Sequence, residues 1–306
     1  MYARIAPRAA RLALATFLTL GLAALSACGN GSSSSTPTPT MSTSLPTTMT
    51  PTTPATSTTT SPTGTRIEVT VYYVGDTTRG YRLFREIHTV TTTANARTAA
   101  VEEIFADPLD PDYMTPWGSL GVSLNSVTKS RGVITVDLHG ITSLRTRPAG
   151  LKAGIASSAV DQLLWTVKDA FNATNKVAVQ ILADGSHIDQ LLGVPVAEPL
   201  AFPDAASTWA QVWITNIQEG DTVTSPVLVE GLGAAFEAQI VWRVYDEAGN
   251  LVKKGWTLSE ECCRMAPYSF KVKLAPGTYL IVVEDTDPSG GEAPGPWQDS
   301  KTVTVS

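Results

Sequence analysis

The chain has 306 residues, of which 43% are hydrophobic and 16% are charged, a lower charged fraction than the quarter typical of soluble domains. This length allows one large domain or two ordinary ones, each with enough chain to bury a core. Three cysteines argue against a disulfide-rich scaffold, and three histidines leave little for a zinc site. The net charge of −6 argues against a nucleic-acid binder, which needs a basic surface.

Residues 1–27 predict a secretory signal peptide, because three arginines precede an apolar run over residues 12–25. That run is shorter than the roughly 20 residues a spanning helix needs. The sequence Leu-Ser-Ala-Cys ending at Cys28 resembles the lipobox of bacterial lipoproteins. The resemblance implies acylation of Cys28, by fatty acids such as palmitate, and anchoring at the extracytoplasmic face of the cell membrane. An ordinary secreted protein with a chance cysteine is the alternative.

Residues 28–64 predict a disordered stalk. Of the 33 residues from 31 to 63, 28 are Ser, Thr or Pro, and such a segment cannot bury enough apolar surface to fold. The stalk accounts for the low charged fraction of the chain. It is interpreted as a plain tether, with O-glycosylation as the open alternative.

Residues 65–200 predict an α+β domain, with two helices on one face of a sheet. Alternating apolar residues indicate strands, Asn95 is a candidate N-cap, and residues 154–172 carry an apolar stripe at helical spacing. The expected strands cover residues 66–74, 81–90, 124–127, 133–138 and 176–183.

Several short motifs of this segment resemble the GerMN domain of sporulation and germination proteins. They include Ala99-Ala100-Val101, Pro116-Trp117-Gly118, Thr135-Val136-Asp137-Leu138, Gln162-Leu163 and Asp184-Gly185. The chain has Asp107-Pro108 where that family usually has Gly-Pro. GerMN domains are similar to ring-building modules of membrane-spanning assemblies, so the resemblance implies scaffolding or assembly in the envelope.

After a linker at residues 201–208, residues 209–306 predict an all-β immunoglobulin-like sandwich. Turn signals separate seven expected strands, at residues 212–215, 227–230, 239–245, 251–258, 269–274, 278–283 and 302–306. The run from Glu219 to Gly231, with Glu237 and Tyr245-Asp246, resembles the immunoglobulin-like domain of bacterial spore germination proteins. That domain often follows a GerMN domain in bacterial lipoproteins.

Five of the seven tryptophans lie in this second segment. Strand parity places Trp242 with Ile240 and Val244, which predicts a core position. Trp213 falls on the opposite face from its neighbours, so Trp213 and nearby Trp209 are the candidate surface for a ligand or partner. Exposed tryptophans can bind sugar rings, but packing or a domain interface is the favoured interpretation.

No catalytic or metal-binding residues are assigned from the sequence, and no cofactor is expected. Asp137 is interpreted as a turn-capping residue. His88, His139 and His187 lack metal-ligand spacing. The acidic run at residues 285–290 begins like a calcium loop, but Pro296 stands where the bidentate carboxylate would be.

Cys262 and Cys263 are adjacent, which brings their α-carbons closer than disulfide partners usually are. In an oxidising envelope they form a strained bridge, remain two thiols or link to another chain. A local loop feature without catalysis is the favoured interpretation.

The leading hypothesis is a non-catalytic, lipid-anchored envelope protein that binds or scaffolds protein partners during envelope or spore-structure assembly or germination. A peptidoglycan-binding or other glycan-binding module is the alternative, and an enzyme of unrecognised class comes third.

Overall fold

The computed structural model describes residues 64–286, 292 and 294–306. The predicted signal peptide, Cys28, the stalk up to residue 63 and turn residues 287–291 lie outside the described residues. All described residues belong to one compact unit. We call the described residues up to 200 the first module and those from 209 onward the second module.

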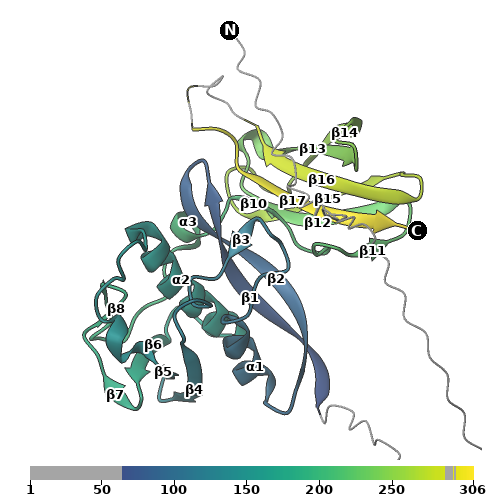
Figure 1. Cartoon of the computed structure of the whole chain (residues 1–306). Helices are drawn as coiled ribbons and strands as arrows, with labels where there is room; N and C mark the ends of the chain where they lie inside the picture. Colours follow the sequence, from purple (N-terminus) through teal and green to yellow (C-terminus); the bar gives the residue numbers. More distant parts are fainter. Residues whose placement is uncertain (1–63, 287–291, 293) are drawn as a thin grey trace, which may run out of the picture. The chain divides into compact units, whose positions relative to one another are not determined.

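The first module is an α+β fold (Figure 1). Its elements are β1 (Thr65–Thr77), β2 (Gly80–Thr92), α1 (Ala96–Glu103), β3 (Tyr113–Met114), β4 (Ser123–Ser130), β5 (Val133–His139), η1 (Ile141–Leu144), α2 (Ala153–Ala170), β6 (Ala178–Ala183), β7 (Ser186–His187), β8 (Gln190–Leu191) and β9 (Val194–Pro195). The expected N-cap is confirmed, because the Asn95 side chain accepts hydrogen bonds from the backbone N–H groups of Arg97 and Thr98, both at 3.1 Å.

The strands of the first module divide between separate sheets, which differs from the single sheet expected. The larger sheets have the orders β2-β1-β3 and β4-β5-β6-β7. β1 and β2 form a long hairpin that pairs from Thr65 with Thr92 to Thr77 with Gly80, and this hairpin pairs with β3 rather than with β4 to β7. Helix α2 packs against both strands of this hairpin, and α1 packs against α2, β1 and β4. The helices therefore join the two sheets into one core.

The second module is a β-sandwich. Its elements are β10 (Val212–Ile214), β11 (Thr222–Val223), β12 (Val227–Gly233), η2 (Phe236–Ala238), β13 (Gln239–Asp246), β14 (Leu251–Leu258), β15 (Ala266–Val272), β16 (Gly277–Asp285) and β17 (Gln298–Val305). One sheet has the order β10-β12-β15 and the other β11-β17-β16-β13-β14. The predicted fold class, α+β followed by an immunoglobulin-like sandwich, is confirmed. The expected linker contains a short helix, α3 (Ala205–Thr208).

Trp242 packs against the core of the sandwich, as its strand parity predicts. Its ring stacks on Phe270 with centroids 4.8 Å apart. Gly255, its partner on β14, makes this possible, because a Cβ there would lie 2.3 Å from the indole. Trp256 follows Gly255 and points to the opposite face of the sheet.

Candidate binding surface

A buried ionic cluster joins the two modules. Lys301 of β17 is 1% exposed, and its ammonium group donates to Asp110 at 2.6 Å, to the Tyr113 hydroxyl at 2.7 Å and to Asp299 at 3.1 Å. All three donors of the lysine are therefore satisfied. Burial alone lowers the pKa of Lys301, but the Asp299 and Asp110 carboxylates outweigh it and raise that pKa, so the lysine stays charged.

The carboxylate of Asp299 ties this cluster to both modules. It accepts a 2.5 Å hydrogen bond from the Tyr113 hydroxyl of the first module. Its other oxygen accepts from the backbone N–H of Ile214, on β10 of the second module, at 2.7 Å. Asp110, Tyr113, Asp299 and Lys301 therefore form specific polar contacts between the modules, and we call these four residues the polar lock.

A second buried cluster in the first module fixes the loop that carries Asp110. Glu86 accepts hydrogen bonds from the backbone N–H groups of Leu109 and Asp110, each at 2.9 Å. His88 lies between Glu86 at 2.6 Å and Glu103 at 2.7 Å. Burial lowers the pKa of His88, but the hydrogen bonds to Glu103 and Glu86 dominate and raise that pKa to about 9. The histidine is therefore protonated at neutral pH.

These acids and bases lie out of reach of a substrate. Glu86, His88, Asp110, Asp299 and Lys301 are all buried, and each is occupied by partners within the fold. General acid–base chemistry requires contact with the reacting group. The clusters are therefore structural: the one around Lys301 joins the modules, and the one around His88 holds the loop that carries Asp110.

An aromatic cluster lies beside this lock, and it corrects the predicted surface role of Trp213 and Trp209. Trp213 is 1% exposed and belongs to the core of the first module, while Trp209 is half-buried. The centroid of Trp209 lies 4.4 Å from that of Trp165 and 5.1 Å from that of Trp213. The parity of Trp213 was predicted correctly, but the first module covers that face. The placement of Trp213 on the surface is wrong, Trp209 is half-buried beside it, and the interface interpretation fits.

The apolar surface of the second module gathers instead on β14, the end strand of its five-stranded sheet. Trp256 is 62% exposed and Leu258 is 54% exposed, and Leu251 and Val252 of the same strand are exposed as well. Lys253 and Lys254 lie between them, exposed and without an ion pair to any described residue. We call residues 251–258 the β14 edge. Local sequence patterns do not show which strand lies at the edge of a sheet, so the sequence could not indicate that these apolar side chains are exposed there.

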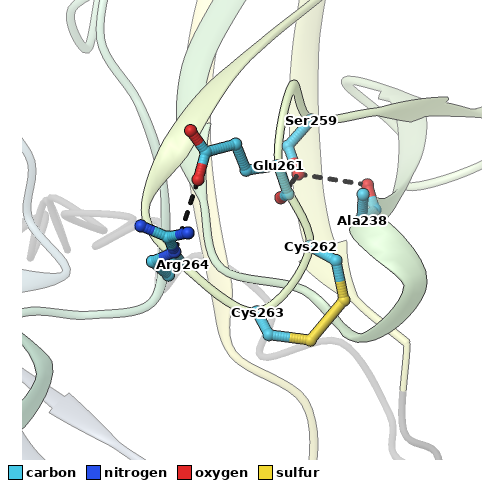
Figure 2. Close-up of a disulfide and its surroundings, with 6 residues drawn as sticks. All are labelled: Ala238, Ser259, Glu261, Cys262, Cys263 and Arg264. Atoms are coloured by element: carbon cyan, nitrogen blue, oxygen red, sulfur yellow. Dashed lines mark hydrogen bonds and ion pairs between the residues drawn. A yellow bond between two sulfur atoms is a disulfide. The ribbon is translucent and has the colours of Figure 1, made fainter.

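The Cys262–Cys263 loop connects β14 to β15, and the two sulfur atoms are bonded to each other in the structure (Figure 2). The backbone N–H of Cys263 donates to the carbonyl of Ala235 at 3.2 Å. The Ser259 hydroxyl donates to the carbonyl of Ala238 at 3.3 Å and to that of Glu261 at 2.9 Å. These bonds fix the end of the β14 edge. Both cysteines are exposed.

The other residues singled out in the sequence have local roles. Asp137 accepts from the backbone N–H of Gly185 at 2.8 Å, which confirms its turn-capping role. His139 contacts Asp184 at 2.8 Å on the surface, and His187 is exposed on β7. Within the described residues, no group of three or more His, Cys, Asp or Glu side chains could hold a metal ion. No helix in the described part of the chain is both long and apolar enough to span a membrane.

Comparisons with known families identify both modules. Residues 70–189 match the model of the sporulation and spore germination family. Residues 211–292 match the model of the immunoglobulin-like domain of bacterial spore germination. The chain therefore contains a sporulation and germination domain followed by a spore-germination immunoglobulin-like domain. This finding confirms both resemblances seen in the sequence.

Solved structures that the chain matches include the tandem GerMN domains of the sporulation protein GerM from Bacillus subtilis. That structure is 18% identical, with a TM-score of 0.35, over 49% of this chain and 50% of its own. The chain thus spans about half the length of that relative. CopC from Methylosinus trichosporium OB3b is 20% identical, with a TM-score of 0.22, over 29% of this chain and 84% of its own. A comparison with curated proteins gives no match.

Proposed function

We propose that this protein is a non-catalytic, lipid-anchored protein of the bacterial cell envelope that binds a protein partner in envelope assembly, sporulation or germination. The observation that carries the proposal is the β14 edge, the end strand of its sheet, which has exposed apolar side chains and contacts β15 near Thr257, whose hydroxyl donates to the carbonyl of Ser269 at 2.9 Å. An open strand edge offers unpaired backbone groups, to which an extended segment of another protein can add as a further strand. The match to two germination-related domains supports the biological setting.

The charge of the β14 edge defines the chemistry of the partner. Lys253 and Lys254 lie exposed between apolar residues, in a chain whose net charge is −6. Opposite charges on neighbouring strands stabilise pairing, and like charges oppose it. The partner is therefore an extended segment that combines acidic and apolar residues. The β14 edge belongs to a compact unit that includes both modules, which the polar lock joins.

A photo-crosslinking residue in place of Trp256 tests partner binding in cells. We expect a discrete crosslinked protein, identifiable by mass spectrometry, and no such product from the same residue in place of Glu230, which is exposed on the other sheet. Lys253→Glu with Lys254→Glu should abolish the crosslink by charge reversal. Lys129→Glu with Lys176→Glu, which reverses exposed lysines of the first module, is the matched control and should leave it unchanged.

The crosslinking result can contradict the proposal in two ways. A missing product from position 256, or a product that survives the reversal of Lys253 and Lys254, would remove the assigned role of the β14 edge. A crosslink to a second copy of this chain would replace the proposed partner with self-association.

Membrane anchoring is tested separately. Cys28→Ala removes the thiol expected to carry the lipid, so the protein should move from the membrane fraction to the medium, as followed by immunoblotting. A variant with Cys262→Ala and Cys263→Ala is the matched control and should remain in the membrane fraction. Retention of the Cys28→Ala protein at the membrane would refute lipid anchoring at this residue while leaving partner binding open.

A further inference from the structure

A polar cleft of about 350 Å³ lies between β2, α2 and α3, away from the β14 edge. Its volume falls within the range of about 300–1,000 Å³ that small-ligand sites occupy. The side chains that could contact a ligand come from three elements of the lining: Tyr81 and Arg82 from β2, Ser157 and Asp161 from α2, and Ser207 and Thr208 from α3. The cleft therefore combines one carboxylate, one guanidinium, one aromatic ring and several hydroxyl groups.

The two charged side chains of the cleft have no ionic partner. Among the described residues, Asp161 forms neither a hydrogen bond nor an ion pair. Arg82 donates to the carbonyl of Tyr81 at 2.8 Å and lies over the ring of Trp297, but its guanidinium forms no ion pair with a described residue. Asp161 and Arg82 carry opposite charges, so the lining of the cleft has no net charge. The cleft is thus suited to a ligand without net charge that offers both donors and acceptors.

The aromatic wall of the cleft is held in place. A Cβ at Gly154 would lie 2.9 Å from Cδ2 of Tyr81, so the glycine lets the ring lie directly on α2. Lys152 donates to the Tyr81 hydroxyl at 2.8 Å. The hydroxyl groups of Ser207 and Thr208 both donate to the carbonyl of Asp204 at 2.9 Å, which orients them beside the cleft. A fixed ring beside oriented polar groups suits a ligand with an apolar face and a hydroxylated rim.

We propose that this cleft binds one ring of an uncharged saccharide, with Asp161 accepting hydrogen bonds from sugar hydroxyl groups. Arg82 donates to the sugar oxygens, and the ring of Tyr81 contacts the apolar face of the sugar. The site places the glycan-binding alternative in the first module, at residues that the sequence did not single out. It is independent of the β14 edge, so failure of either proposal leaves the other standing.

Calorimetric titration of the full chain with a trisaccharide of N-acetylglucosamine tests the site, and a glucose trisaccharide distinguishes a wall sugar from sugars in general. We expect saturable binding that Asp161→Asn weakens by about tenfold or more, because a hydrogen bond to a charged group is lost. Asp189→Asn, at an exposed carboxylate outside the cleft, should leave the affinity unchanged. Ser157→Trp should block the cleft, whereas Ser186→Trp on exposed β7 should not.

The pH of the titration adds a readout that a purely structural role would not produce. Burial raises the pKa of Asp161 to about 6, and the charged or titratable groups around it are Tyr81 and Arg82 of the lining and Lys152, which donates to the Tyr81 hydroxyl. A protonated carboxyl loses acceptor capacity, so affinity should fall between pH 7 and pH 5 in the natural chain and stay flat in Asp161→Asn. Absence of binding to either trisaccharide overturns the proposal, as does equal binding by Asp161→Asn. Binding of free alanine in place of both sugars would assign the cleft to a zwitterion and overturn it too.

Discussion

Replacing Lys301 with methionine is expected to lower the free energy of unfolding by about 3–5 kcal/mol, because it removes the cation from a buried ion cluster. Methionine keeps much of the volume of the lysine stem, so lost packing contributes little. The carboxylates of Asp110 and Asp299 would remain buried without their cation. Urea denaturation at pH 7, followed by tryptophan fluorescence, measures the change.

The matched control is Lys253→Met, which removes an exposed lysine without an ion pair to any described residue. Its effect should stay within about 0.5 kcal/mol. A triple variant with Lys301→Met, Asp110→Asn and Asp299→Asn should recover part of the loss, because the uncompensated charges are gone. A Lys301→Met protein as stable as the Lys253→Met control would show that the cluster does not join the modules energetically.

Local signals in the sequence were sufficient for the longer strands, for helices α1 and α2 and for the Asn95 cap, but not for the two-residue strands or for α3. Asn95 precedes an apolar helical pattern and does cap α1, and Asp137 of β5 does bind the backbone of a turn, at Gly185 after β6. The cap of α1 joins groups two and three residues apart, so residue type and spacing carry that information, whereas Asp137 and Gly185 lie 48 residues apart in the chain. Local alternation also predicted seven strands in the second module, and it missed the two-residue strand β11.

The polar lock between the modules could not be inferred from local sequence patterns. The last strand was expected to begin at Thr302, because the preceding Gln-Asp-Ser-Lys run has no apolar alternation, whereas β17 begins at Gln298. Register pairs Ile281 with Lys301 and Val283 with Asp299, which places both polar residues on the core side of the sheet. Their burial depends on Asp110, which lies 191 residues from Lys301 in the chain.

Replacing Trp213 with alanine is expected to lower the free energy of unfolding by about 3–5 kcal/mol, the usual cost of deleting a buried large aromatic side chain. The indole is 1% exposed, and its centroid lies 6.4 Å from that of Tyr72 and 6.5 Å from that of Phe84, both in the first module. Its strand, β10, also contributes Val212 and Ile214 to the core of the second module. The cavity would open where the two cores meet.

Trp256→Ala is a control that removes the same side chain from an exposed position. With 62% of that side chain already in water, the loss should stay below about 1 kcal/mol. Equal losses of stability for the two alanine variants would mean that Trp213 does not couple the modules. If only Trp213→Ala lowers the free energy of unfolding strongly, then Trp256 contributes little to folding, and the β14 edge is available for binding.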